Sequence, residues 1–325
     1  MNTATTSIAF DPRHTARQRL RETLFRSATM VAAVLVLILL GGVALSLLRG
    51  AWPAFAHFKL AFLTREIWNP VTDEYGALAP VYGTLVTSLI AMIIAIPVSF
   101  GIAVFLTELA PAWLKRPVGV AIELLAAVPS IIFGIWGLFI LAPVLQRHVQ
   151  PWLIEWLGPL PGIGKLFQGP PFGIGILTAS VVLAIMVLPF ISAVVRDVFE
   201  TVPDVLKESA YGLGATTWEV IWKVVVPYSR TGIVGGIMLG LGRALGETMA
   251  VTFVIGNAHR ISPSLLAPGT TISASIANEF TEAIGDLYTS SLVALGALLF
   301  LITFTVIAAA RFMLLRLDRR ALSSV

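Results

Sequence analysis

An arginine and a glutamate occur inside a long apolar segment of the sequence. Arg243 and Glu247, one helical turn apart, are the only charged residues between positions 231 and 256. A charge inside a membrane costs on the order of 3 kcal/mol even on lenient insertion scales. A helical ion pair returns only about 0.5 kcal/mol, and the order Arg before Glu is the weaker one. We therefore expect a role in a translocation pathway, where the planar guanidinium of Arg243 suits an oxyanion.

Two neighbours of Arg243 complete this candidate site. Glu247 would hold the guanidinium in place and moderate its affinity, so that an anion is not trapped. Thr248 offers a hydroxyl donor, although packing against another helix is the more ordinary role of a membrane threonine. No catalytic residue or metal site is expected, because the sequence has no cysteine and its four histidines lie far apart, outside the apolar segments.

A second constellation lies in the polar segment between residues 196 and 230. Glu208, Ser209 and Ala210 are followed after three residues by Gly214, and Pro227 comes thirteen residues after Gly214, directly after three valines. Helical spacing of the apolar residues distinguishes this segment from an ordinary loop. It predicts two short helices joined by a glycine turn at one membrane surface.

The two short helices have recognisable ends. Asp204 is a candidate cap for the first helix, and Gly212 and Gly214 permit the turn that follows it. The second helix would end at Pro227. An apolar face of this second helix is expected from the spacing of Trp218, Ile221 and Trp222. A hairpin of this kind, joined directly to two spans, is stiff enough to transmit a push from outside the bilayer.

The composition places both constellations in a membrane protein. The chain of 325 residues is 57% hydrophobic and 12% charged, whereas soluble domains carry about 25% charged residues. The predicted fold class is an all-α polytopic membrane protein with six transmembrane helices. We place these helices near residues 29–48, 81–107, 121–145, 172–195, 231–256 and 288–313.

Local features of the spans predict their shape. Pro97, Pro129 and Pro189 fall inside spans and should kink them. In the fifth span, Gly232, Gly236 and Gly240 recur every four residues on one face, a pattern that lets two helices approach closely. The glutamates near span ends, Glu108 and Glu123, are interpreted as interfacial residues in contact with water.

The distribution of lysine and arginine predicts the orientation of the spans. Fifteen of these residues lie in the segments on the side of both termini, and six lie in the segments on the other side. Both termini are therefore expected on the cytoplasmic side of a bacterial inner membrane. Because the basic residues are separated by apolar runs, no nucleic acid partner is expected. The predicted organisation is a cytoplasmic tail (1–28), an anchor helix (29–48), a periplasmic loop (49–80), a transmembrane domain (81–314) with the cytoplasmic loop 196–230, and a tail (315–325).

The Glu208-to-Pro227 spacing resembles the signature loop of ABC importer permeases, written E-A-A-x3-G-x9-I-x-L-P. Here Ser209 replaces an alanine, and valines replace the isoleucine and leucine. Three further segments resemble the phosphate-specific branch of these permeases: Tyr82–Ser88, Val128–Gly137 and Gly240–Ala250. The resemblance covers most of residues 75–256 and implies the MetI-like fold of a type I ABC importer permease.

In that family the signature loop is a coupling helix that docks on a separate ATPase. The resemblance thus implies a non-catalytic subunit that forms half of a translocation pathway for inorganic phosphate. Implied partners are a second permease (PstA-like), an ATPase dimer (PstB-like), a periplasmic phosphate-binding protein (PstS-like) and membrane lipid. The chain is expected to bind no cofactor, while ATP and Mg²⁺ are used by the ATPase. Its nearest phosphate-loop candidate, residues 162–166, lacks the required glycine and hydroxyl residue.

Three alternative functions stay open from the residues alone. An ABC permease for sulfate or molybdate would carry similar charges in a similar place. A secondary transporter or channel that works alone would be expected to show an inverted repeat with broken helices, and no convincing repeat is visible. A membrane-embedded enzyme would need a catalytic cluster, for which the scattered histidines give no support.

Overall fold

The structure confirms the predicted helical fold and the number of membrane-length helices. The computed structural model describes residues 12–322, with side chains from Arg21 to Phe312. Within that part of the chain, six helical segments are long and apolar enough to cross a membrane. They are Arg21–Phe58, Leu78–Leu109, Ser130–Leu157, Ile176–Glu200, Thr217–Gly246 and Asp286–Phe312.

The chain divides into two units at Arg49. The first unit contains most of α1 (Pro12–Phe58), whose apolar stretch has no buried residues. The second unit begins at Gly50 and contains the other spans. Its helices in the first half are α2 (Ala61–Thr64), α3 (Leu78–Val104), α4 (Ala112–Ala127), α5 (Ser130–Trp136), α6 (Ala142–Val144) and α7 (Gln150–Leu157). The later helices are α8 (Ile176–Glu200), α9 (Asp204–Gly212), α10 (Thr217–Val220), α11 (Val226–Gly246), α12 (Met249–Thr252), α13 (Ile272–Glu279) and α14 (Asp286–Leu322).

Short irregular helices connect several of these elements. The π-helical segments are Phe105–Leu109, Gly137–Leu141, Leu145–Val149 and Ile221–Val225, and a 3₁₀ helix covers Ile163–Phe167. Two short strands, β1 (Trp68–Asn69) and β2 (Glu74–Tyr75), pair antiparallel with Trp68 opposite Tyr75. The π-helical segments keep the second, third and fifth spans continuous through places where the helix changes its winding.

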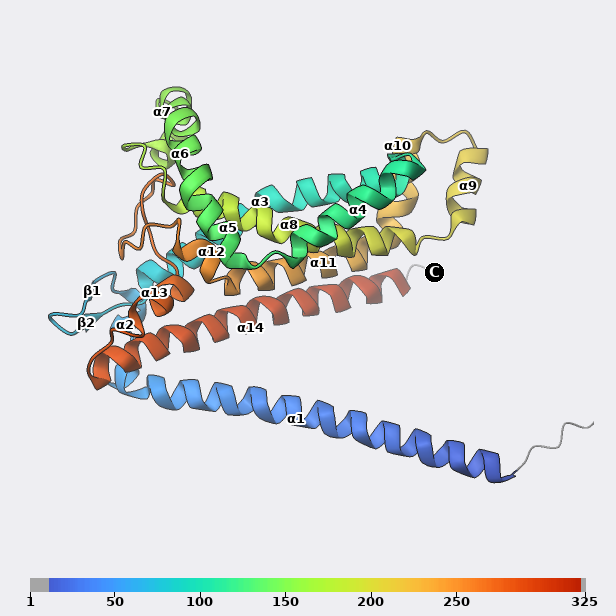
Figure 1. Ribbon diagram of the computed structural model, residues 1–325, viewed down its shortest axis with the longest axis horizontal. Coiled ribbons are helices and arrows are strands. Elements are labelled where there is room, and N and C mark those ends of the chain that lie inside the picture. Colours follow the sequence, from blue (N-terminus) through green and yellow to red (C-terminus); the bar gives the residue numbers. More distant parts are fainter. Residues whose placement is uncertain (1–11, 323–325) are drawn as a thin grey trace, which may run out of the picture. The chain divides into compact units, whose positions relative to one another are not determined.

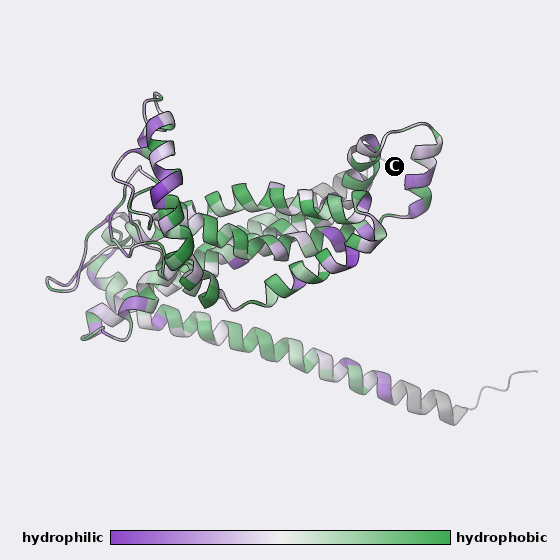
Figure 2. Cartoon of the chain, turned by 45° about the horizontal axis from the view of Figure 1, so that its top comes forward, coloured by the Kyte–Doolittle hydropathy of each residue, from purple (hydrophilic) through white to green (hydrophobic). Residues whose placement is uncertain are grey.

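The centre of the second unit is a bundle built around α8. Figure 1 shows α8 lying along α3 and α11, with α14 against α11, and each of these helix pairs is in direct contact. The bodies of these helices are hydrophobic, whereas polar residues gather at their ends and in the connections (Figure 2). Two-thirds of the most apolar part of α8 is buried within the unit, more than in any other span. α8 is therefore the core helix.

Close packing of α11 on α8 depends on glycine, as the spacing of Gly232, Gly236 and Gly240 predicted. A Cβ atom on Gly232 would lie 2.5 Å from Cγ1 of Val198, and one on Gly240 would lie 2.6 Å from Cγ1 of Ile191. Because a Cβ atom this close to either side chain would force the helices or side chains to shift, the absence of a side chain on α11 sets the distance between the two helices.

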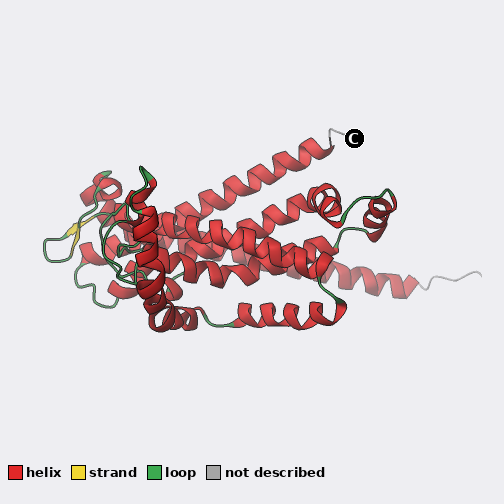
Figure 3. Cartoon of the chain, turned by 90° about the horizontal axis from the view of Figure 1, so that it is seen from above, coloured by secondary structure: helices red, strands yellow, loops and turns green. Residues whose placement is uncertain are grey.

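A polar cluster holds together the end of the second unit that carries β1 and β2 (Figure 3). One carboxylate, Glu279, accepts hydrogen bonds from Trp68 Nε1 at 2.6 Å and from the Tyr288 hydroxyl at 2.7 Å, and its other oxygen lies 2.6 Å from His259 Nε2. Although burial opposes ionisation, the bonds from His259 and Tyr288 hold the pKa of Glu279 below its usual value. Glu279 of α13 therefore links the β1–β2 strand pair, the loop that contains His259, and α14.

The third and fifth spans differ from the prediction. The predicted helix 121–145 is interrupted at Val128, which has an extended backbone, and a new helix begins after Pro129. The predicted helix 231–256 ends at Gly246, since Glu247 is also extended. Pro129 therefore breaks its span, because a proline disfavours the helical conformation of the residue before it. Pro97 and Pro189 lie inside α3 and α8, which run through them.

The predicted boundaries of the tails and loops also differ from the observed helices. Helix α1 begins at Pro12 and continues to Phe58, so it covers parts of the predicted tail 1–28 and loop 49–80. Helix α14 extends to Leu322, well into the predicted tail 315–325. Residues 1–11 and 323–325 of those predicted tails lie outside the described part of the chain.

Substituting Gly240 tests whether glycine sets the distance between α8 and α11. Gly240→Ala should destabilise the folded protein by about 1–3 kcal/mol, because its methyl group overpacks the contact with Ile191. The matched control is Gly235→Ala on the same helix, where a Cβ meets nothing within 4 Å. Thermal unfolding in detergent measures the difference, and equal melting temperatures for the two variants would contradict it.

Candidate functional site

Residues 204–225 form two short helices joined by a glycine turn, as the sequence predicted. We call this segment the α9–α10 hairpin. Helix α9 contains no buried residue, and Gly214 adopts a φ of +88°, a left-handed conformation that favours glycine. The second helix begins with a capping box, in which Thr216 and Glu219 each bond the other's backbone N–H. The hairpin therefore has a defined shape although it projects from the bundle (Figure 1).

The connection between the hairpin and the fifth span differs from the prediction. Pro227 does not end the second short helix, because it lies in the first turn of α11 and the helix continues from Thr217 to Gly246. The missing N–H of the proline is accommodated next to the π-helical segment Ile221–Val225. A push on α10 is therefore transmitted directly into the fifth span.

The apolar side chains of the hairpin face two ways. Val220, Ile221 and Val225 are buried in the main core, whereas Trp218 is 66% exposed and Leu213 at the turn is 91% exposed. The predicted apolar face of Trp218, Ile221 and Trp222 is therefore only partly buried. Large exposed apolar side chains thus lie beside the polar surface of α9, a combination typical of interaction sites.

Ion pairs tie the base of the hairpin to other spans. Lys207 Nζ in α9 lies 2.6 Å from Glu108 Oε1 at the end of the second span, and these side chains are only 15% and 7% exposed. Arg196 near the end of α8 lies 3.1 Å from Glu123 in α4. The interpretation of Glu108 as a water-exposed interfacial residue was therefore wrong, because its carboxylate is buried against a lysine from the hairpin.

Arg243 lies in the last turn of α11, where a cation is favoured by the helix dipole. Its guanidinium carbon is 4.6 Å from the centre of the Phe190 ring of α8, within the range of a cation–π contact. The Nε atom is buried and has no hydrogen-bond partner. This Nε–H is thus a buried donor that the described residues leave unsatisfied. Phe190 carries no signal in the sequence, because only the packing of α8 on α11 brings its ring to Arg243.

Glu247 and Thr248 are placed differently from the expectation. Glu247 lies beyond the end of α11 and accepts a hydrogen bond from the Ala250 N–H at 3.2 Å, and among the described residues it forms no ion pair with Arg243. The predicted helical pair is therefore absent. The Thr248 hydroxyl donates to the Gly246 carbonyl at 3.4 Å. Both side chains therefore form hydrogen bonds with backbone groups at the junction between α11 and α12.

The start of the third span lies against α12, which follows the end of the fifth span. A Cβ atom on Gly134 in α5 would lie 2.8 Å from the Met249 carbonyl oxygen and 3.2 Å from the Ala250 Cα in α12. Non-helical backbone at membrane depth is tolerated where protein buries it or where it lines a cavity. The segments Val128–Gly137 and Gly240–Ala250 are thus in contact through α5 and α12.

The geometry defines a class of protein: a multi-pass membrane permease with a projecting helical hairpin between its fourth and fifth spans. Residues 96–322 match the family described as binding-protein-dependent transport system inner membrane components. The chain belongs to this family.

Two named relatives align with nearly the whole chain. It is 65% identical over 304 residues to the phosphate transport system permease protein PstC of Mesorhizobium japonicum, covering 94% of this chain and 93% of that one. It is 60% identical over 299 residues to the PstC protein of Pasteurella multocida, covering 92% and 93%. Among solved structures, a bacterial alginate ABC transporter in complex with an alginate-bound periplasmic protein has a chain with a TM-score of 0.60, 17% identity, and coverage of 93% and 97%. This likeness supports the fold.

The buried pair Lys207–Glu108 should be necessary for a correctly held hairpin. Lys207→Ala should cost about 3 kcal/mol, because it leaves the carboxylate of Glu108 buried without a partner. The double variant Lys207→Met with Glu108→Gln should recover much of that loss. Denaturation of the single and double variants in detergent provides the comparison. A double variant no more stable than Lys207→Ala would show that the charge pair is not the relevant contact.

Proposed function

We propose that the chain is the permease subunit of an ABC importer for inorganic phosphate, with both termini in the cytoplasm. The observation that carries this proposal is the α9–α10 hairpin, which has the spacing of an ATPase-docking loop and is continuous with the fifth span. The near full-length similarity to PstC permeases supports phosphate as the cargo. The chain would form half of the pathway and break no covalent bond.

The other subunits of the proposed assembly would supply the second half of the pathway, the ATPase and the phosphate-binding protein. A second permease (PstA-like) would complete the pathway, and a PstB-like ATPase dimer would contact the hairpin at the exposed Glu208 and Ser209, next to the half-buried Ala210. The ATPase would use ATP and Mg²⁺, and this chain would bind no cofactor. A periplasmic phosphate-binding protein (PstS-like) would deliver the anion to the opposite end.

The mechanism follows from the stiffness of the hairpin and its connections. Closure of the ATPase dimer on ATP would move α9, and the Lys207–Glu108 pair would carry that motion to the second span, 2.6 Å away. The continuous helix from Thr217 to Gly246 would carry it to the fifth span. The spans would open outward, receive phosphate near Arg243, and return inward after hydrolysis.

Arg243 is the proposed anion-recognition residue of the pathway. Its contact with Phe190 keeps the guanidinium in place without neutralising it, unlike a carboxylate partner. The proposed role of Glu247 as a partner of Arg243 is accordingly replaced by a local one, in which Glu247 and Thr248 shape the backbone of the break. Moderate binding suits transport, because the anion must leave as well as enter.

A reconstituted complex distinguishes the proposed cargo from other oxyanions. The chain is co-expressed with its neighbouring subunits and placed in vesicles with binding proteins for phosphate or sulfate. Phosphate with its binding protein should stimulate ATP hydrolysis and enter the vesicles, and sulfate with its own should do neither. Stimulation by sulfate would overturn the assigned cargo. Phosphate uptake without any ATPase subunit would overturn the proposed class.

Arg243→Ala should reduce phosphate uptake at least about tenfold, since a hydrogen bond to a charged group contributes about 1.5–3 kcal/mol. Assembly with the ATPase should be unchanged. The matched control is Arg230→Ala, an exposed arginine at the start of the same helix. Uptake by proteoliposomes and copurification of the subunits are the two readouts. Normal uptake by Arg243→Ala would show that Arg243 does not recognise the anion in the pathway.

Gly214→Ala should disconnect ATP hydrolysis from transport, because alanine at a φ of +88° costs about 1–2 kcal/mol and distorts the turn. Glu208→Gln should act in the same direction by weakening the docking surface. The control is Gly212→Ala, where a Cβ meets nothing within 4 Å and φ is not left-handed. The measured quantity is phosphate imported per ATP hydrolysed, and an unchanged ratio in Gly214→Ala would count against coupling through the turn.

A further inference from the structure

Two tryptophans of α7 form an exposed apolar face at the end of the second unit opposite the α9–α10 hairpin (Figure 1). Trp152 is 55% exposed and Trp156 is 64% exposed. Their ring centres lie 6.5 Å apart, so both side chains lie on the same face of the helix. The neighbouring 3₁₀ helix adds the exposed Ile163. The proposed function gives this surface no role.

The opposite face of α7 is fixed to the rest of the unit. Gln150, in the first turn of α7, is fully buried, and its Oε1 accepts a hydrogen bond from the Gly173 N–H at 2.9 Å. Leu145, in the preceding π-helical segment, is also buried. Gly173 lies three residues before Ile176, where α8 begins. The direction of the tryptophan face is therefore defined, and α7 is joined to the beginning of the core helix.

Helix α7 runs across the direction of the membrane-crossing helices. Figures 1 and 3 differ by a quarter turn about the long axis, and in both views α6 and α7 lie steeply across that axis, along which α8 extends. Since α8 crosses the bilayer, α7 runs along the membrane surface near the beginning of α8. A helix in this position buries its apolar face at the boundary between headgroups and acyl chains.

The exposed residues of the third span change in the order expected of a helix that leaves the hydrocarbon layer. Phe139, Ile140 and Val144 are exposed and apolar. Arg147 and His148 follow, and the two tryptophans come next. Tryptophan is enriched at the headgroup level, and basic side chains near the ends of spans extend to that level. The tryptophan face is thus continuous with the exposed apolar surface of a membrane span.

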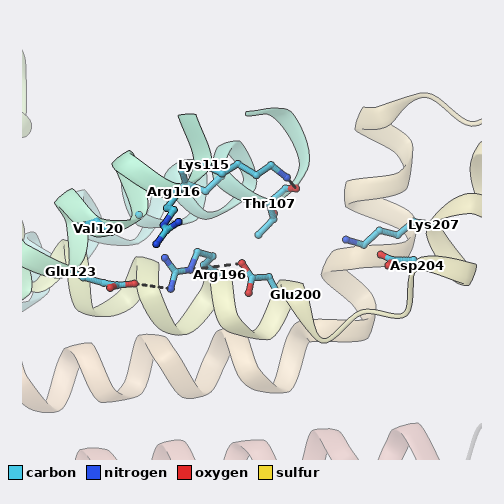
Figure 4. Close-up of a pocket in the computed structure, with 11 residues that line it drawn as sticks. Thr107, Lys115, Arg116, Val120, Glu123, Arg196, Glu200, Asp204 and Lys207 are labelled. Atoms are coloured by element: carbon cyan, nitrogen blue, oxygen red, sulfur yellow. Dashed lines mark hydrogen bonds and ion pairs between the residues drawn. The ribbon is translucent and has the colours of Figure 1, made fainter. Parts of the chain in front are cut away.

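Arg147 supplies a charge suited to a lipid headgroup. At the hairpin end of the unit, arginine is paired within the protein, since Figure 4 shows Arg196 bonded to Glu123 and Glu200. Arg147 is exposed and forms no ion pair with any residue in the described range. A guanidinium binds phosphate oxygens through paired donors, and headgroup phosphates lie at the level where tryptophan gathers.

We propose that the Trp152–Trp156 face of α7 lies in the headgroup layer of the membrane and binds phospholipid, with Arg147 in contact with headgroup phosphates. In the proposed orientation this is the periplasmic leaflet. Through Gln150 and Gly173, the lipid contact holds the beginning of α8 at the membrane surface while the α9–α10 hairpin acts on the other end of that helix. The occupant is lipid rather than another protein, because the face continues the surface of a span and its helix runs along the bilayer.

Site-specific photo-cross-linking of the assembled transporter in cell membranes identifies what covers this face. The photoreactive amino acid benzoylphenylalanine replaces Trp156, and the intact mass of the chain is measured after irradiation. A phospholipid adduct is expected. Val71, 91% exposed in the loop between β1 and β2 at the same end, is the control position and should give no lipid adduct. A product joined to another protein, or no lipid adduct at position 156, would overturn the proposal.

The double variant Trp152→Ala with Trp156→Ala separates a lipid contact from a protein interface. Loss of a tryptophan anchor in a protein interface weakens association about thirtyfold, whereas here copurification of the subunits should be unchanged. Phosphate imported per ATP hydrolysed in vesicles should fall, and Trp152→Tyr with Trp156→Tyr should preserve it, because tyrosine also favours the headgroup level.

Two results of this experiment would contradict the proposal. Loss of copurification in the alanine variant would show that the face contacts a protein subunit. Unchanged coupling in that variant would show that lipid at α7 does not hold α8. The preference for phosphate over sulfate should be the same in all variants, so failure here leaves the proposed cargo unaffected.

Discussion

The close contact between α8 and α11 is the constraint on which the other features of this protein depend. The α9–α10 hairpin connects these two helices, so a force on it can reorient the bundle only if they do not slide independently. Glycines at positions 232, 236 and 240 bring α11 against valine and isoleucine side chains of α8. The same contact brings Phe190 over the guanidinium of Arg243. Helix packing and the proposed anion recognition would therefore share one interface.

The helix breaks at Val128 and Glu247, next to the third and fifth spans, show how the protein satisfies peptide groups that leave a helix. Each break frees peptide groups that lipid cannot satisfy, which costs several kcal/mol per group. Here α5 and α12 pack closely at Gly134, and the carboxylate of Glu247 accepts the Ala250 N–H. The break at Glu247 closely follows Arg243 in the sequence, and non-helical backbone beside a charged side chain is suited to line a pathway for a polar solute. The charge and the broken helices are parts of one arrangement.

Charged residues at the hairpin end serve a different purpose from Arg243. Lys207 with Glu108 and Arg196 with Glu123 connect α9, α4 and α8 to the ends of the spans. These connections make the hairpin part of the bundle although α9 itself buries no residue.

The sequence by itself determined the helical class, the six spans, the glycine face of α11 and the two-helix hairpin, because each depends on local composition or on spacing along one helix. It also placed Arg243 in a membrane segment. Only the tertiary structure decided that Glu247 lies beyond the end of α11 and that Pro227 lies inside a continuous helix. It also decided that Glu108 is buried against Lys207 and that the Phe190 ring contacts Arg243. These outcomes depend on contacts between segments distant in the sequence, and on whether neighbouring helices can satisfy a broken backbone. Helical periodicity carries no information about either.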